Sequence, residues 1–316
     1  MNRGSVCVFS ERQDVALELL SAGRTLAGEA AVVSIVIGPD AEKAAREQIA
    51  HGADAVLIVE PGDGADPVKV QLEALGGTLA RHEPDVVLIG STVHGTEVAA
   101  RFAQRHGLGC ATECTQLEWI EGKLVVERNC LGRFVSRQVF ETRPAIATLR
   151  PRRFEPTARD ERRRGTIETL KIDAPPTRTP IIATRERAKS NVRIDKSDVV
   201  VGIGRGLRSE HDLRMIEKLA AVLGGVVGAT RPLTDDLRWL AADRKVGLSG
   251  VTIKPKLYIA CGISGQIEHN VGMRESGIVV AINNDPSAPI MQQADYCITA
   301  DLHEIVPALI EAIGNV

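Results

Sequence analysis

The chain of 316 residues is long enough for two domains of ordinary size. Its 44% hydrophobic content and formal net charge of −2 are typical of a soluble globular protein, and they give no electrostatic reason to expect binding to nucleic acid or to a membrane surface. Aromatic residues make up only 3% of the chain, so we expect an aliphatic core of the kind that α/β proteins build around buried parallel strands.

The first residues enter a predicted strand at once, without the apolar stretch of a secretory signal, and no apolar run approaches the ~18 residues of a membrane span. We therefore expect a cytoplasmic protein without membrane insertion. The six cysteines are scattered without C-x-x-C pairs, which favours neither a disulfide scaffold nor a zinc or iron–sulfur site. We expect all six to be reduced, structural side chains.

Strand-like runs alternate with helical segments rich in Ala, Glu and Leu at the start of the chain, which predicts an α/β domain with a parallel sheet. The runs are Val6–Phe9, Val32–Ile37, Ala55–Val59 and Val86–Ile89. A helix around Glu97–Arg105 follows. Residues 115–149 then show short strands with turn signals at Glu121-Gly122 and Leu131-Gly132, which is typical of an antiparallel addition.

An arginine-rich stretch follows, with seven arginines in residues 150–164, and the chain stays rich in Pro, Thr and Arg to about residue 193. A nucleic-acid patch is not favoured, because only one aromatic residue, Phe154, lies among the arginines. We expect a solvated linker or a subunit contact over residues 151–192. This linker would join an N-terminal α/β domain of residues 1–150 to a second domain of residues 193–316.

The second domain opens with the strand Val199–Ile203, the turn Gly204-Arg205-Gly206 and a helix from about Glu210 to Leu223. A nicotinamide dinucleotide site is not supported. The sixth position of the G-x-G-x-x-G fingerprint is Leu207, and no acidic residue ends the next strand, Val226–Ala229. The sequence also contains no P-loop motif.

Residues 256–269 form the most informative stretch, because an apolar strand runs into Gly262-x-x-Gly265 and then into a predicted helix ending at His269. Such a turn offers backbone N–H groups and a helix N-terminus, which suit a phosphate. Two further apolar runs end in Asn283-Asn284-Asp285-Pro286 and in Asp301. We interpret the three units as parallel strands whose C-terminal ends converge on one ligand.

Six motifs between residues 199 and 302 resemble, in order and nearly in spacing, the flavin-binding domain of the electron transfer flavoprotein alpha subunit. They are Gly202-Ile-Gly-Arg-Gly206, Gly228-Ala-Thr-Arg-Pro232, Val246-Gly-Leu-Ser-Gly250, Gly262-Ile-Ser-Gly-Gln-Ile-Glu-His269, Ala281-Ile-Asn-Asn-Asp285 and Ala300-Asp301. The N-terminal domain resembles the same family more loosely, through Ile89-Gly-Ser-Thr92, Gly95-x-Glu-Val-Ala-Ala-Arg101 and Ala111-Thr-Glu-Cys-Thr115.

The resemblance implies a C-terminal domain with a doubly wound parallel sheet that binds FAD. It implies that Arg231 lies against the isoalloxazine ring, that Ser249 donates to N5, and that His269 faces the C2 carbonyl side. It also implies that Ser264 and Gly265 cradle phosphate or ribityl oxygens.

Further residues enter through the same resemblance. Asn283 and Asp301 would hold the adenosine end, and Arg205 would contact the pyrophosphate region. The other cofactor-binding residues that the resemblance implies are Gly250, Gly262 and Gln266. It implies neither a metal ligand nor a catalytic residue.

Two positions depart from the family pattern. Leu248 stands where the fatty-acid-oxidation branch usually has Gln, and Glu268 stands where the family usually has Gln before the final His. A carboxylate at position 268 would favour the oxidised flavin and raise the pKa of His269.

Taken singly, the candidate residues have simpler roles. Arg231 could be an arginine in a surface turn, and His269 could be an ordinary histidine on a helix surface. Asp285-Pro286 could be only a turn, and Asp301 could cap a helix over Leu302–Ala312.

The resemblance implies the alpha subunit of a heterodimer with a beta subunit, an electron carrier rather than a stand-alone enzyme. Its FAD would carry electrons between a dehydrogenase, of the acyl-CoA type or a similar flavoenzyme, and an acceptor. Thr230-Arg231-Pro232 and Gly265-Gln266 resemble the branch of anaerobic, nitrogen-fixing and electron-bifurcating systems, in which ferredoxin and NADH also take part. The alternative is a non-redox nucleotide-binding or sensor protein.

Overall fold

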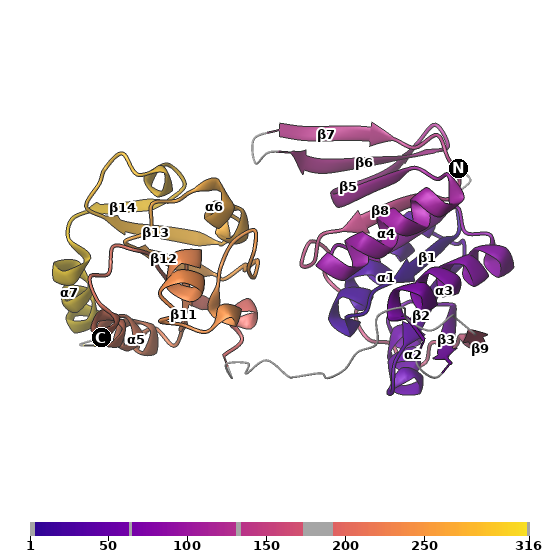
Figure 1. Ribbon diagram of the computed structural model, residues 1–316, viewed down its shortest axis with the longest axis horizontal. Helices are drawn as coiled ribbons and strands as arrows, with labels where there is room; N and C mark the ends of the chain where they lie inside the picture. The colour runs from indigo at the N-terminus through magenta and orange to yellow at the C-terminus, as the bar shows by residue number, and fades with distance from the viewer. Residues whose placement is uncertain (1–3, 63–64, 131–133, 173–191, 315–316) are drawn as a thin grey trace. The chain divides into compact units, whose positions relative to one another are not determined.

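The computed structural model describes residues 4–62, 65–130, 134–172 and 192–314 (Figure 1). The chain divides into two compact units, Met1–Ile182 and Ala183–Val316. Each unit has its own sheet, and no strand pairing joins the two sheets among the described residues. Each unit is therefore described by itself.

The N-terminal unit is built on a nine-stranded sheet in the order β7-β6-β5-β8-β4-β1-β2-β3-β9. The parallel part consists of β1 (Val6–Phe9), β2 (Val32–Ile37), β3 (Ala55–Pro61), β4 (Val86–Gly90), β8 (Ala145–Leu149) and β9 (Thr166–Ile172). The antiparallel addition consists of β5 (Cys110–Ile120), β6 (Lys123–Cys130) and β7 (Phe134–Val139), and β5 joins it to β8 in a parallel pairing. The predicted α/β domain with an antiparallel addition is confirmed.

Alternation along β1 divides the core between the two faces of this sheet. Val6 and Val8 belong to one apolar cluster with residues of α1 (Gln13–Ala27) and α2 (Ala41–Ala50). Cys7 and Phe9 belong to a second cluster with residues of α3 (Pro67–His82) and α4 (Val93–His106). Successive strand residues point to opposite faces, so helices cover both sides of the parallel strands.

The segment 115–149 differs from its prediction at one end. Its last strand, β8, pairs parallel with β4 and thus belongs to the main sheet rather than to the antiparallel addition. The turn at Glu121-Gly122 is confirmed, because both residues have positive φ, 50° and 77°, in the hairpin between β5 and β6. The turn expected at Leu131-Gly132 lies outside the described residues.

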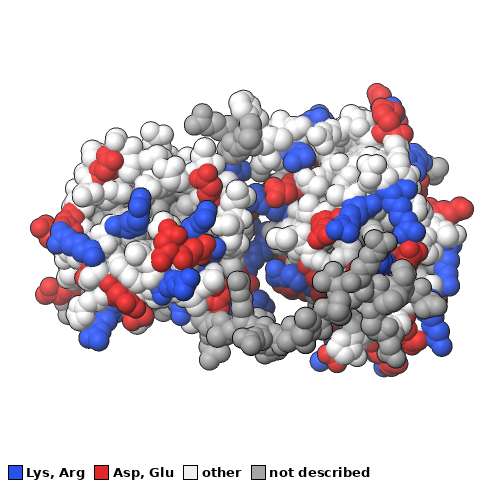
Figure 2. Space-filling view, in the orientation of Figure 1, with Lys and Arg blue, Asp and Glu red and all other residues white. Residues whose placement is uncertain are grey.

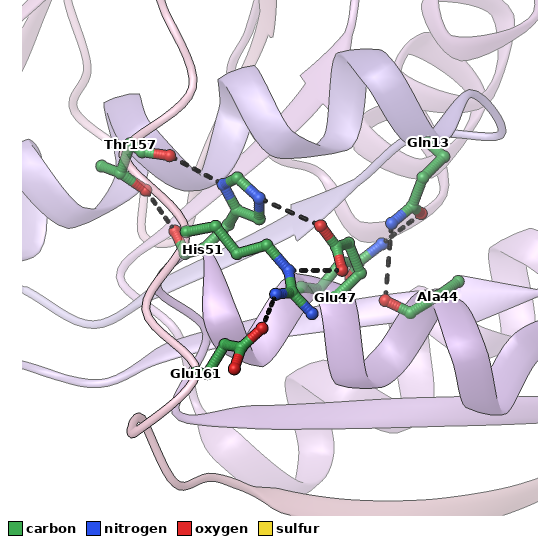
Figure 3. Close-up of polar contacts among 8 residues, drawn as sticks. Gln13, Ala44, Glu47, His51, Thr157 and Glu161 are labelled. Carbon is green, nitrogen blue, oxygen red and sulfur yellow. Dashed lines mark hydrogen bonds and ion pairs between the residues drawn. The ribbon is translucent and has the colours of Figure 1, made fainter.

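The arginine-rich stretch is tied to the N-terminal unit instead of forming a solvated linker. The carbonyl of Thr157 accepts a hydrogen bond from Nδ1 of His51 at 2.7 Å, and its hydroxyl donates to the His51 carbonyl, also at 2.7 Å (Figure 3). Arg159 pairs with Glu47 at 3.1 Å, and this guanidinium lowers the pKa of the Glu47 carboxyl. Thr157 and Arg159 are therefore bound to carbonyl and carboxylate groups of the N-terminal unit and of its helix α2.

The strand β9 extends this attachment, because it pairs with β3 along residues 166–172. Arg163 adds an ion pair with Asp54 at 2.7 Å just before the strand. The linker expected over residues 151–192 is therefore shorter at its N-terminal end, and residues up to Ile172 belong to the N-terminal unit. Its remaining part, residues 173–191, lies outside the described residues.

The C-terminal unit is a five-stranded, wholly parallel sheet in the order β11-β10-β12-β13-β14. Its strands are β10 (Val199–Ile203), β11 (Val226–Ala229), β12 (Leu257–Cys261), β13 (Ile278–Asn283) and β14 (Tyr296–Thr299). Its helices are α5 (Leu213–Val222), α6 (Ile267–Met273) and α7 (Leu302–Gly314), with short helical turns η1 (Ile194–Lys196), η2 (Glu210–Asp212), η3 (Pro232–Asp236), η4 (Ala242–Arg244) and η5 (Pro289–Gln292). Because β10 is the first strand and lies inside the sheet, the strand order reverses between β10 and β12.

Two apolar clusters cover the two faces of this sheet. One contains residues of α5 and α7, and the other contains Met273 of α6. The predicted doubly wound sheet is thereby confirmed. One helix differs from its prediction: α6 begins at Ile267, so His269 lies in its first turn and not at its end. The preceding residues stay non-helical, with Gly262 and Gly265 at φ of 61° and 82°.

The cysteines differ from one another in burial. All six cysteines are free: Cys7, Cys114 and Cys261 are buried, Cys130 is half-buried, and Cys110 and Cys297 are exposed. In the described part of the chain, no His, Cys, Asp or Glu cluster could hold a metal ion. No helix among the described residues has the length and apolarity that crossing a bilayer requires.

Candidate functional site

A cavity of about 700 Å³ opens at the carboxyl edge of the C-terminal sheet. The turns that follow all five strands contribute to its wall, and so does the loop of residues 246–249. Its wall includes the turns after β10 and β12, between which the strand order reverses. Open parallel sheets bind ligands at this position, and a cavity of this size suits a cofactor.

Ten of the eleven residues predicted for the site line this one cavity. They are Arg205, Arg231, Ser249, Gly262, Ser264, Gly265, Gln266, His269, Asn283 and Asp301. The exception is Gly250, whose N–H donates to the carbonyl of Gly247 at 3.0 Å. A Cβ at position 250 would lie 2.3 Å from the carbonyl oxygen of Lys245. Gly250 therefore allows the loop backbone to pack closely, without contributing to the cavity wall.

Glycines bring the backbone turns of β10 and β12 into direct contact. A Cβ at Gly206 would lie 2.5 Å from Cα of Gly262, and a Cβ at Gly204 would lie 2.4 Å from its carbonyl oxygen. Beyond this contact, the backbone N–H groups of Ser264 and Gly265 donate no hydrogen bond to any described residue. Unpaired amides in a glycine-containing turn can bind a phosphate group closely.

Arg231 follows β11 and extends into solvent, with 72% of its side chain exposed. Its guanidinium lies 3.6 Å from Asp235, but Asp235 is nearer to Lys245, at 2.8 Å. The hydrogen bond from Lys245 lowers the pKa of Asp235. Because Lys245 largely matches the Asp235 charge, the positive charge of Arg231 remains available to a ligand.

Thr230 and Arg208 also line the cavity and were missing from the predicted set. The hydroxyl oxygen of Thr230 is buried and has no hydrogen-bond partner among the described residues, so it is a free polar group at the wall. Thr230 belongs to the motif Gly228-Ala-Thr-Arg-Pro232, so the sequence did contain a signal for this residue. Arg208 forms an ion pair with Asp301 across 93 residues of sequence, and no local pattern could have indicated that pair.

His269 is buried, with 7% exposure, and both ring nitrogens have partners inside the chain. Nδ1 donates to the carbonyl of Val246 at 3.2 Å, and Nε2 accepts from the hydroxyl of Tyr258 at 2.8 Å. Burial lowers the pKa of His269 to about 4, so the ring is neutral at physiological pH.

The expected rise of the His269 pKa through Glu268 is therefore wrong. The Glu268 side chain is exposed at the cavity wall, and it is desolvation of the imidazole that sets the direction of the shift. The simpler alternative, an ordinary histidine on a helix surface, is wrong because His269 is buried.

Asn283 and Asp301 combine a place at the wall with internal hydrogen bonds. The amide of Asn283 donates to the carbonyl of Ile263 at 2.7 Å, which fixes the β12 turn. Asp301 accepts from the backbone N–H of His303 at 2.9 Å and so caps α7, as the simpler alternative proposed. Asp285-Pro286 does form a turn, in which Asp285 accepts from the backbone N–H of Ser287 at 2.8 Å.

These features match the chemical needs of FAD. The free amides of the β12 turn can take the pyrophosphate, and the unpartnered Thr230 hydroxyl offers a hydrogen bond. Three arginines and three acidic residues line the wall: Arg205, Arg208, Arg231, Glu268, Asp285 and Asp301. On the visible face of the C-terminal unit, shown on the left in Figure 2, basic and acidic side chains are likewise interspersed.

Comparisons with known proteins point the same way. Residues 193–274 match the family model of the electron transfer flavoprotein FAD-binding domain, and residues 6–175 match the electron transfer flavoprotein domain. The chain is 36% identical to the electron transfer flavoprotein subunit alpha of Thermoanaerobacterium thermosaccharolyticum, over 98% of the chain and 97% of that protein. It is 34% identical to the subunit of the same name in Bacillus subtilis (95% and 93% covered) and 36% identical to Protein FixB of Azorhizobium caulinodans (97% and 88% covered).

Proposed function

The chain belongs to the electron transfer flavoprotein alpha-subunit family, and we propose that it works as the FAD-binding half of a heterodimer with a beta subunit. In this role it takes electrons from a dehydrogenase and passes them to an acceptor. One observation supports the proposal most directly: a single cavity at the strand-order reversal gathers ten residues that are spread over almost a hundred positions, from Arg205 to Asp301. The non-redox sensor alternative has no comparable support.

When bound, FAD supplies the redox chemistry, because its isoalloxazine ring takes up and releases electrons. The residues of the chain bind and orient the cofactor. The amides of Ser264 and Gly265 hold the pyrophosphate, and Arg205 adds positive charge beside them. Arg231 and Ser249 act at the ring, where a cation and a hydroxyl donor stabilise negative charge.

We assign Asn283 and Asp301 to the adenosine end. Both side chains are already held by internal hydrogen bonds, so little conformational freedom is lost when the ligand binds. His269 contributes a neutral ring and no formal charge. We therefore assign the main influence on the flavin potential to Arg231.

The electron donor is proposed to be an acyl-CoA dehydrogenase or a similar flavoenzyme, with a cytoplasmic location. An electron-bifurcating system, with ferredoxin and NADH as further partners, is the second candidate. It is favoured by the segments Thr230-Arg231-Pro232 and Gly265-Gln266, which resemble that branch. The relatives named electron transfer flavoprotein subunit alpha and Protein FixB match the chain about equally well and do not separate the two candidates.

Co-expression with an electron transfer flavoprotein beta subunit tests the proposal. We expect a heterodimer with a flavin absorption band, and a chain produced alone that loses FAD during gel filtration because part of the ring stays in water. One FAD per heterodimer, accompanied by AMP, would support the simple carrier, and two FAD molecules would support bifurcation. A monomer that retains stoichiometric FAD would refute the heterodimer, and a heterodimer without flavin would refute the electron-carrying role.

A further inference from the structure

A chain of two buried hydrogen bonds connects the middle of the C-terminal sheet to the loop that carries Ser249. It starts at Tyr258 of β12, which is fully buried, passes through His269 of α6, and ends at the carbonyl of Val246. The two bonds measure 2.8 Å and 3.2 Å. Three separate segments are thus joined at the cavity wall, which His269 and Val246 line.

The chemistry of the partners fixes the direction of both hydrogen bonds. A backbone carbonyl can only accept, so Nδ1 of His269 must carry the proton. A neutral imidazole then has Nε2 as its acceptor, and the hydroxyl of Tyr258 must donate to it. No ring N–H remains to point into the cavity. This arrangement differs from a histidine that would donate from its ring to the flavin.

This series of hydrogen bonds ends at Val246, which begins a tightly packed loop. A Cβ at Gly247 would lie 2.6 Å from the carbonyl oxygen of Glu268, and one at Gly272 would lie 2.4 Å from the backbone nitrogen of Gly247. The N–H of Leu248 donates to the Glu268 carbonyl at 2.6 Å. The loop of residues 246–250 therefore rests on the first turns of α6, and His269 is the side chain that bonds it to that helix.

We propose that Tyr258 is a positioning residue that acts through His269 to hold the loop of residues 246–250, and with it the hydroxyl of Ser249, at the cavity wall. The consequence for the flavin depends on the role proposed above for Ser249. The effects on the imidazole of His269 and on the loop are independent of the role of Ser249. Gly202 provides the space for this arrangement, since a Cβ there would lie 1.9 Å from the Tyr258 hydroxyl oxygen.

The chain contains two tyrosines, which supplies a matched control. Tyr258→Phe removes only the hydroxyl that donates to His269. Tyr296→Phe removes a hydroxyl from a tyrosine that is 62% exposed on the edge strand β14. Both variants would be prepared in the full-length chain with 15N-labelled histidine, and the His269 signals would be assigned by their loss in His269→Gln.

We expect a protonated Nδ1 and an unprotonated, hydrogen-bonded Nε2 for His269 in the parent and in Tyr296→Phe at pH 7. In Tyr258→Phe the Nε2 signal should shift as it loses its donor, and amide hydrogen exchange at Leu248 and Gly250 should accelerate on the order of tenfold. Identical nitrogen signals and exchange rates in the two tyrosine variants would overturn the proposal. So would a parent chain with a proton on Nε2, which keeps the test decisive if Tyr258→Phe does not fold.

A last measurement separates this inference from the proposed function. After loading with FAD in the heterodimer, Tyr258→Phe should shift the flavin reduction potential relative to Tyr296→Phe. If the nitrogen signals and the loop exchange change while the potential does not, the positioning of the loop is supported, and the assignment of Ser249 to the flavin fails.

Discussion

The two units share one topological device and use it differently. In each, the first strand lies inside a run of parallel strands, and the strand order reverses beside it, between β1 and β4 in one unit and between β10 and β12 in the other. In the C-terminal unit the turns at this point are rich in glycine, and the β12 turn leaves the backbone amides of Ser264 and Gly265 free. In the N-terminal unit, Ser10 accepts from the N–H of Arg12 at 3.2 Å, and Thr92 accepts from that of Gly95 at 2.8 Å.

Packing increases the difference between the two turns. A Cβ at Gly90, the last residue of β4, would lie 2.7 Å from the side chain of Val15, so the N-terminal turn is closed by side chains. Both units thus have a strand-order reversal at which a ligand could bind. The residues that follow the strands decide whether a phosphate can approach the backbone there. Turn composition is the better guide to a ligand site than the fold.

The strongest test compares one glycine from each unit. Gly265 and Gly122 both have positive φ, 82° and 77°, but a Cβ at position 265 would lie 2.4 Å from the Ile290 backbone nitrogen, and one at 122 would meet nothing within 4 Å. Gly122→Ala should cost about 1–2 kcal/mol of unfolding free energy, and Gly265→Ala about 3–5 kcal/mol with loss of FAD. Urea unfolding and flavin absorbance after gel filtration measure both. Equal costs with retained FAD would contradict the comparison.

The second prediction concerns acid stability of the C-terminal unit. Burial lowers the pKa of His269 to about 4 from its ordinary value of 6.5, so the unfolded chain binds a proton that the folded chain rejects. The stabilising effect is complete above pH 6.5 and is lost as the pH falls toward 4, a change of about 3 kcal/mol. His269→Gln should flatten the pH dependence of unfolding over that range. The exposed His106→Gln serves as the control and should keep the parental slope.

Arg231 tests the charge at the open end of the cavity. Arg231→Ala should lower the one-electron potential of the bound flavin by roughly 65–130 mV, the equivalent of one charge-assisted hydrogen bond of about 1.5–3 kcal/mol. Arg231→Lys should be intermediate, because lysine keeps the charge and loses the planar fork. Redox titration decides the order. Arg214→Ala, an exposed arginine of α5 outside the cavity wall, should match the parent.

A smaller effect is expected at the closed turn of the N-terminal unit. Thr92→Ala removes the side-chain cap of α4 and should cost about 1 kcal/mol of unfolding free energy. Flavin content and potential should stay unchanged, because the capped turn belongs to the N-terminal unit, whereas the candidate flavin cavity is lined by residues of the C-terminal unit. A loss of FAD in this variant would show that the two units are coupled more closely than their separate cores indicate.

The smallest effect is expected for Glu268→Gln. The side chain is exposed at the wall, so removing its charge should raise the flavin potential by less than ~60 mV after solvent screening. Because Glu268 does not set the pKa of His269, the offset between variant and parent should be constant from pH 6 to 8. Titrations that diverge over this range would establish coupling between the two residues.

Local pattern was sufficient for most of the fold. Apolar runs located β1, β2, β10 and β11 to the residue, because buried parallel strands are continuous in sequence. It failed for β8 and β9, whose partners β4 and β3 lie far away along the chain, and the abundance of arginine concealed the strand that follows residue 164. Strand pairing is a tertiary property that composition does not encode.

The candidate site shows the same division. Motifs identified the residues that line the cavity, but the burial of His269 and its bond to Tyr258 depend on how α6 packs over β12. Glu268 and His269 are neighbours in sequence, which suggested that their charges interact. In the structure, however, the Glu268 side chain is exposed and the His269 side chain is buried. The Arg208–Asp301 pair was likewise invisible until the turns after β10 and β14 were brought together.

The late arrival of β9 has a consequence for synthesis of the chain. Residues 55–61 of β3 have their outer partner only when residues 166–172 have been made, more than a hundred positions later. Until then the emerging chain presents an apolar strand with one open row of amides and carbonyls, a surface on which a second nascent chain can pair. A truncated fragment ending near residue 150 would keep that edge open permanently. Ending it after Ile172 would pair β3 and leave the largely exposed strand β9 as the edge instead, and fragments of these two lengths should differ sharply in the fraction recovered as monomer.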